Sequence, residues 1–106
     1  MNQNDWIEWY VQHGGNRDLM LDGRERVLFH PEHGFTSFLI HDDVLEVHHM
    51  AGDGKFWVSH LKKVMKVFEL KKIHMFTRRN PKAWIRKYGG RITGYYMEAD
   101  YDELKI

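Results

Sequence analysis

The stretch Val44–Leu70, VLEVHHMAGDGKFWVSHLKKVMKVFEL, decides the predicted fold. It predicts a strand over Val44–His49, a glycine turn over Gly52–Gly54 and an amphipathic helix over Lys55–Leu70. The face of this helix that we expect to be buried consists of Trp57, Leu61, Val64, Met65 and Phe68. The opposite, polar face consists of Ser59, Lys62, Lys63 and Lys66. Because the first N–H groups of a helix lack partners within the helix, a strand that turns through two glycines into a helix indicates a site for phosphate or another anion.

The composition is typical of one folded, soluble domain. The chain has 106 residues, of which 42% are hydrophobic and 14% aromatic, enough for a single core. It has no cysteine, which excludes disulfides and thiolate chemistry. No apolar run reaches membrane-spanning length, and the N-terminus lacks a basic segment followed by an apolar one. We therefore expect a cytoplasmic protein with no membrane partner.

The net charge of +1 conceals an uneven distribution of charge along the chain. Between Lys55 and Arg91 there are twelve Lys and Arg residues and one acidic residue, Glu69. This pattern has two interpretations. It fits an ordinary solvated surface, and it also fits a basic half that binds an anionic ligand, either a phosphate-bearing cofactor or nucleic acid.

The rest of the chain predicts a helix and loop before the sheet, and further elements after the long helix. The predicted elements, in order, are a helix around Trp6–Val11, strands over Arg26–His30, Phe35–His41 and Val44–His49, the helix Lys55–Leu70, a strand over Lys71–Arg79, a helix after Asn80 and a strand over Arg91–Asp100. This order favours an α/β domain whose sheet has helices on both faces. We expect one domain over residues 1–106, with a helix and loop over 1–25, a sheet core over 26–100 and a tail over 101–106.

A two-residue turn at Asp42-Asp43 would fix the pairing of two of these strands. It predicts Leu39 opposite Glu46 and Ser37 opposite His48. Strict alternation would then place the Glu46 and His48 side chains on one face of the sheet and His49 on the other.

Two motifs in this order resemble those of the GNAT family of acetyl-CoA-dependent N-acetyltransferases. The first is His49-Met50-Ala51-Gly52-Asp53-Gly54, which is similar to the family's Q/R-x-x-G-x-G/A turn. The second is Asn80 followed by Ala83 and by Gly89 or Gly90. The resemblance covers Arg26 to Asp100 and identifies the chain as a minimal or degenerate, phage-like member. It implies a GNAT-like mixed central sheet, an antiparallel meander plus a parallel strand pair.

The resemblance also implies a site for acetyl-CoA as co-substrate. The implied cofactor-binding residues are His49, Met50, Ala51, Gly52, Asp53, Gly54, Lys55, Arg78, Arg79 and Asn80. Asp53 departs from the family pattern because it puts a negative charge in the loop that should hold pyrophosphate. The family's general-acid tyrosine would fall at Ile85, and the nearest phenol is Tyr88.

Glu46, His48 and Tyr88 are the candidate catalytic residues. Acetyl transfer needs a neutral amine, so a base must take its proton. Glu46 is the first candidate, because an acid in the run Val44–Val47 is costly to bury without a role or a partner. The alternatives are that Glu46 pairs with a neighbouring Lys or Arg, and that His48 is an ordinary strand residue. We expect no metal site, since His41 and His48 approach across the hairpin without an evident third ligand.

Two functions remain open from the sequence. The first is an acetyl-CoA-dependent N-acetyltransferase that acts on an amine acceptor. The second is a non-catalytic GNAT-like module whose basic C-terminal half contacts nucleic acid or an acidic protein.

Overall fold

The computed structural model describes residues 1–15, 24–77, 80–95 and 97–105. The chain divides into two compact units, Met1–Phe76 and Thr77–Ile106. The prediction that all 106 residues form one domain stays a prediction.

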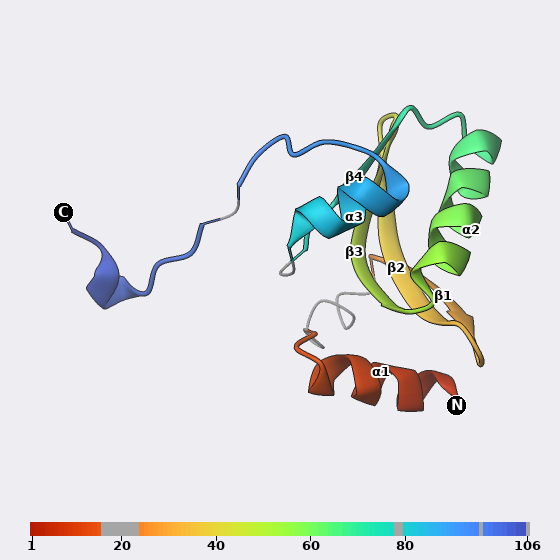
Figure 1. Ribbon diagram of the computed structural model, residues 1–106, viewed down its shortest axis with the longest axis horizontal. Helices are drawn as coiled ribbons and strands as arrows, with labels where there is room; N and C mark the ends of the chain where they lie inside the picture. Colours follow the sequence, from red (N-terminus) through yellow and green to blue (C-terminus); the bar gives the residue numbers. More distant parts are fainter. Residues whose placement is uncertain (16–23, 78–79, 96, 106) are drawn as a thin grey trace. The chain divides into compact units, whose positions relative to one another are not determined.

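The first unit contains a four-stranded mixed sheet. Its strands are β1 (Arg26–His30), β2 (Gly34–His41), β3 (Val44–Gly52) and β4 (Lys72–Met75), in the spatial order β1-β2-β3-β4 (Figure 1). The pairs β1–β2 and β2–β3 are antiparallel, whereas β3 and β4 are parallel. The parallel pair requires a crossover, and the helix α2 supplies it. The predicted α/β class, with a meander followed by a parallel pair, is therefore confirmed.

Strand β4 is shorter than the sequence predicts. Its ladder with β3 joins Val44–Val47 to Lys72–Met75 and ends there. Phe76 and Thr77, which were predicted to continue the strand, are not in it. Arg78 and Arg79, the predicted ligands of the cofactor's 3′-phosphate, lie outside the described residues. Because β3 runs on to Gly52, its second half extends beyond the part that β4 covers.

A β-bulge shifts the register between β2 and β3. Leu39 lies opposite Glu46, as predicted, but Ser37 lies opposite His49 and not His48. Phe38 pairs with Val47, which leaves His48 as the extra residue of β3. The prediction for Ser37 is wrong because it assumed an uninterrupted ladder, and a bulge places two residues of one strand against one of the other.

The bulge also changes which side chains share a face of the sheet. Residues directly opposite each other on paired strands project to the same face. Ser37 and Leu39 are two residues apart on β2, so their side chains project to the same face. Their partners His49 and Glu46 therefore project to that face as well. The prediction that His49 lies on the face opposite Glu46 is therefore wrong.

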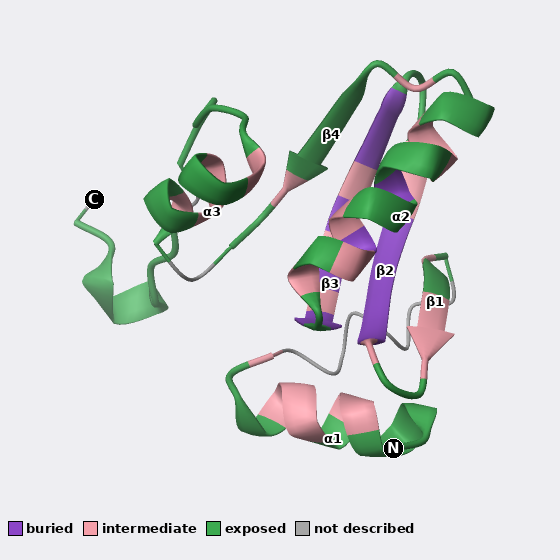
Figure 2. Cartoon of the chain, turned by 45° about the vertical axis from the view of Figure 1, so that its right-hand side comes forward, coloured by how far each residue is buried: buried purple, intermediate pink, exposed green. Residues whose placement is uncertain are grey.

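The hydrophobic core lies on the other face, under α2 (Gly54–Val67). Its fully packed members are Phe38, Leu45, Val47 and Leu61. Figure 2 shows buried residues concentrated on β2, β3 and the inner side of α2. The predicted polar face of α2 is exposed, as expected. Phe68 is not part of the core: it is 53% exposed, because the helix ends at Val67 and Phe68 is the C-cap.

The helix α1 (Gln3–Gln12) packs against the face of the sheet that α2 leaves open. The ring of Tyr10 meets Phe35 and His49 edge-on, with centroids 5.3 Å apart in both pairs. The helix begins with a capping box in which Asn2 and Asp5 each bond the other's backbone N–H. Within the first unit, helices therefore lie on both faces of the sheet.

The second unit contains α3 (Pro81–Tyr88) and the short 3₁₀ helix η2 (Tyr101–Glu103). As the sequence predicts, Asn80 caps α3, with its side chain accepting from the Lys82 N–H at 3.0 Å. The predicted strand Arg91–Asp100 is wrong for its described residues, 91–95 and 97–100, which form no strand and are exposed. The local sequence cannot by itself make a strand, because a strand needs a ladder partner.

Candidate functional site

The glycine at the end of β3 is needed for the close approach of two strands, and this need explains it without an anion site. Gly52 has a φ of 96°, and a Cβ there would lie 2.2 Å from the His33 carbonyl oxygen. Gly34 has a φ of 100°, and its Cβ would lie 1.9 Å from the Ala51 carbonyl oxygen. The two glycines pair across β2 and β3. Their lack of side chains is therefore needed for the strands to approach at this end.

Asp53 caps the start of α2 with its own carboxylate. Its Oδ1 accepts from the Phe56 N–H at 3.1 Å, and its Oδ2 lies 3.2 Å from His33 Nδ1. The hydrogen bond from the Phe56 N–H is the largest cause of the lowered pKa of Asp53; burial opposes it, and the bond and charge of His33 lower the pKa further. The Asp53 N–H in turn donates to the His33 carbonyl oxygen at 2.9 Å. Two of the amides at this turn thus already have partners within the protein.

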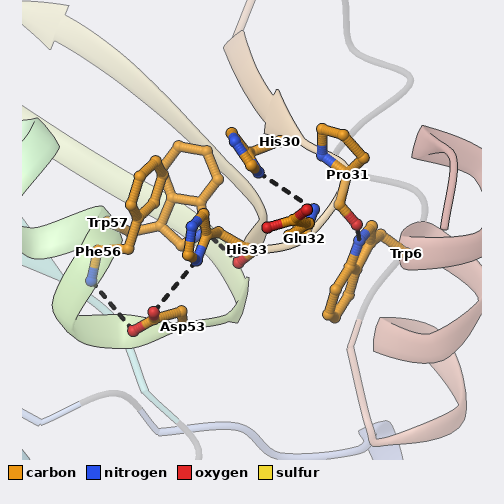
Figure 3. Close-up of polar contacts among 8 residues, drawn as sticks. All are labelled: Trp6, His30, Pro31, Glu32, His33, Asp53, Phe56 and Trp57. Atoms are coloured by element: carbon orange, nitrogen blue, oxygen red, sulfur yellow. Dashed lines mark hydrogen bonds and ion pairs between the residues drawn. The ribbon is translucent and has the colours of Figure 1, made fainter.

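The turn between β1 and β2 holds both helices of the first unit (Figure 3). The Trp6 indole of α1 donates to the Pro31 carbonyl oxygen at 2.9 Å. The Trp57 indole of α2 donates to the His33 carbonyl oxygen at 2.8 Å. The His33 ring also stacks on Phe56, with centroids 4.0 Å apart and an angle of 10° between the planes. This turn therefore fixes where α2 begins.

A shallow pocket of about 340 Å³ lies beside the first three turns of α2. Its lining combines two lysines, a hydroxyl and two aromatic rings with the Asp53 carboxylate. The lining residues are Asp53, Lys55, Phe56, Ser59, His60 and Lys63. Of the predicted cofactor residues, Asp53 and Lys55 line this pocket, while Gly52 ends β3 and Gly54 begins α2. His49, Met50 and Ala51 lie within β3, and Asn80 belongs to the second unit.

A cluster of acids and histidines occupies the face of the sheet that carries Glu46. His48 Nδ1 lies 2.5 Å from Glu25 Oε1, and the Glu25 side chain is only 3% exposed. Glu46 Oε2 lies 3.4 Å from both His48 Nε2 and His41 Nε2. Among the residues that the structure describes, the ion-pair contacts of Glu46 are with these two histidines and not with Lys or Arg.

The pKa values of the two adjacent histidines, His48 and His49, are shifted in opposite directions. Burial disfavours the charged form of His48, but the hydrogen bonds and charges of Glu25 and Glu46 outweigh it, so the pKa of His48 is raised. Burial dominates for His49 and lowers its pKa, with only partial compensation by the charge of Glu25. His49 Nδ1 lies 2.6 Å from the Tyr10 hydroxyl. His48 therefore keeps its proton to a higher pH than an ordinary histidine, and His49 loses its proton at a lower pH.

Sequence reasoning brought together two of the three catalytic candidates and missed their main partner. Glu46 and His48 are in contact, but Tyr88 belongs to the second unit, where its ring meets Trp84. Glu25 was assigned to a polar loop. The available signal was that Glu25 directly precedes β1, so one more residue of the β1–β2 register would place it opposite Leu39.

Comparisons with known proteins do not assign the chain to a family. No protein-family model matches the sequence, and neither a curated protein nor a solved structure matches it. In the described part of the chain, no helix is long and apolar enough to cross a membrane. Among the same residues, no group of three or more His, Asp or Glu side chains could hold a metal ion.

Proposed function

We propose that the protein transfers an acetyl group from acetyl-CoA to an amine, with His48 as the base and Glu25 as the residue that orients it. The observation that carries this proposal is the Glu25–His48 bond of 2.5 Å beside Glu46. A buried carboxylate bonded to Nδ1 fixes the imidazole ring, and the proton would be taken up at Nε2, which lies 3.4 Å from Glu46 Oε2. Such a pair is costly to bury, which supports a role beyond packing.

The proposed step moves one proton and exchanges one bond. Neutral His48 accepts a proton at Nε2 from the amine, and the amine nitrogen attacks the thioester carbonyl carbon. The new C–N bond forms, the C–S bond breaks, and the thiolate of CoA leaves and is protonated from solvent. Because only neutral His48 can accept the proton, the rate should rise with pH through the raised pKa of His48.

Two features of the first unit support a place for acetyl-CoA. The ladder of β3 with β4 stops at Val47, so the backbone of His48–Gly52 on that edge is not paired with β4 and suits an extended chain such as pantetheine. The pocket at the start of α2 carries Lys55 and Lys63, which suit the cofactor's phosphates. Asp53 opposes this attraction, because its carboxylate lines the same pocket.

The test compares substitutions at the two candidate bases with a matched control. His48→Gln should lower kcat roughly 10²–10⁴-fold and leave acetyl-CoA affinity nearly unchanged. Glu46→Gln should lower kcat less if His48 is the base, and more if Glu46 is. His74→Gln, an exposed histidine on the neighbouring strand β4, is the control and should change neither quantity. Calorimetry measures cofactor binding, and mass spectrometry measures transfer to a panel of amines.

Two results would overturn the proposal. One is wild-type protein that gives no heat with millimolar acetyl-CoA. The other is His48→Gln protein that acetylates amines as fast as His74→Gln protein.

A second candidate function is a non-catalytic module that binds nucleic acid or an acidic protein. The exposed side of α2 carries Lys62, Lys63 and Lys66, and no acidic residue occurs between Gly54 and Val67. Replacing these three lysines with Ala should weaken DNA binding and flatten its dependence on salt, because each lost phosphate contact reduces counterion release. DNA binding at physiological salt without acetyl-CoA affinity would favour this function.

A further inference from the structure

Three buried polar atoms beside the Glu25–His48 pair have no hydrogen-bond partner among the described residues. They are Glu25 Oε2, Ser37 Oγ and His49 Nε2. Ser37 is fully buried, His49 is 3% exposed and the Glu25 side chain is 3% exposed. Buried polar groups are nearly always bonded to protein or to ordered water, so three together in so small a domain need an explanation.

The strand register brings these three residues to the same region of one face. Ser37 and His49 are direct partners across β2 and β3. Glu25 precedes Arg26, which pairs with Phe38, so Glu25 continues β1 on the face that carries Ser37. The Glu25 carboxylate is bonded to His48, which is the residue before His49 in the chain. The bulge is what brings His49 to this face.

The donors and acceptors of the three atoms can be assigned from their neighbours. Burial lowers the pKa of His49, so its ring is neutral and carries one N–H. A phenol is a stronger acid than an imidazole N–H, so the Tyr10 hydroxyl donates to His49 Nδ1 at 2.6 Å and the ring hydrogen is on Nε2. The site then offers one donor at His49, one acceptor at Glu25 and a hydroxyl that can do either. A metal ion or an ammonium group would face the N–H of His49 unfavourably, whereas water both donates and accepts.

We propose that Glu25 Oε2, Ser37 Oγ and His49 Nε2 bind one internal water molecule. This water receives a hydrogen bond from His49, donates one to Glu25 and bonds the Ser37 hydroxyl, which gives it the three partners typical of buried water. This water links the Tyr10–His49 pair to the Glu25–His48 pair, which gives one chain of hydrogen bonds, Tyr10–His49–water–Glu25–His48. Tyr10, on α1, thereby becomes a positioning residue for His48. The inference does not depend on acetyl transfer.

The first test uses the wild-type protein and needs no substitution. Nitrogen-15 NMR of the histidine side chains should find His49 as the Nε2–H tautomer. A rotating-frame cross peak should connect that hydrogen to a long-lived water molecule, and a high-resolution crystal structure should have one ordered water within hydrogen-bond distance of all three atoms. An Nδ1–H tautomer, a dry site, or an anomalous scattering peak from a metal ion would each overturn the proposal.

The second test compares two neighbouring buried hydroxyls. Ser37→Ala removes a partner of the water and should abolish the water cross peak and shift the titration midpoint of His48. Thr36→Val is the matched control, since Thr36 is equally buried but its hydroxyl donates to the His49 carbonyl oxygen at 2.8 Å and not to the site. Tyr10→Phe should also shift the His48 midpoint, because His49 loses the donor that fixes its tautomer. Equal effects of Ser37→Ala and Thr36→Val on His48 would refute the chain.

Discussion

The substitution Glu25→Gln should destabilise the protein, and by more at low pH than at high pH. It keeps the size of the side chain and an acceptor oxygen, but it removes the negative charge that His48 contacts at 2.5 Å. The raised pKa of His48 means that the folded protein holds this proton more tightly than the unfolded chain does. The stability from this contact is therefore fully present below the unfolded pKa of about 6.5 and is lost as the pH rises through the folded pKa.

The size of the effect follows from the burial of the two partners. The Glu25 side chain is 3% exposed and His48 is 17% exposed, so solvent screens their interaction little. A hydrogen bond to a charged group contributes about 1.5–3 kcal/mol, and we expect a loss in this range at pH 6. As the pH rises through the raised pKa of His48 toward pH 8.5, the ring loses its charge, and a neutral bond remains possible in the variant. The loss there should be about 1 kcal/mol or less.

Urea unfolding of wild type and variant at the two pH values measures this difference. Glu32→Gln is the control, because Glu32 is exposed and lies in the turn after β1; it should change the unfolding free energy by less than about 0.5 kcal/mol at either pH. A loss for Glu25→Gln that is the same at pH 6 and pH 8.5 would refute the charge-based reasoning. A loss no larger than that of Glu32→Gln would refute the buried contact itself.

Three further substitutions test the core, the turn and the proposed cofactor site. Leu61→Ala should lower the unfolding free energy by about 3 kcal/mol, since Leu61 is fully buried, whereas Val67→Ala, 75% exposed on the same helix, should cost under about 0.5 kcal/mol in the same urea assay. Gly52→Ala should destabilise by roughly 2 kcal/mol or more, because its Cβ meets a backbone oxygen, while Gly14→Ala, at a similar φ with nothing within 4 Å, should cost about 1 kcal/mol. Asp53→Asn keeps an oxygen that caps α2 but removes the charge, so it should tighten acetyl-CoA binding in calorimetry without changing helix content by circular dichroism; weaker binding would contradict the proposed phosphate site.

Periodicity was sufficient for the elements that depend on local sequence. The long helix was predicted within three residues of its observed end at Val67, because one apolar stripe and a capping turn bound it. The cap and first turn of α3 were likewise predicted from Asn80 and Pro81. These features need no knowledge of distant residues.

The candidate site could not be predicted in the same way, because it depends on non-local pairing. A bulge in β3 is invisible in the run Val44–Gly52, yet it moves His49 to the face of Glu46. Glu25 lies 23 residues from His48 in sequence, and only the β1–β2–β3 register brings them together. The predicted strand Arg91–Asp100 failed for the same reason: the local sequence could not show whether a partner strand exists.

The turn Pro31–His33 has a consequence for anyone who re-engineers this chain. An exposed hairpin turn is ordinarily a safe place to insert a tag, a protease site or new termini. Here its carbonyl oxygens hold the indoles of Trp6 and Trp57, one from each helix of the first unit. A cut or insertion at this turn would disturb a hydrogen bond to each of the two helices at once, so new termini belong elsewhere on the chain.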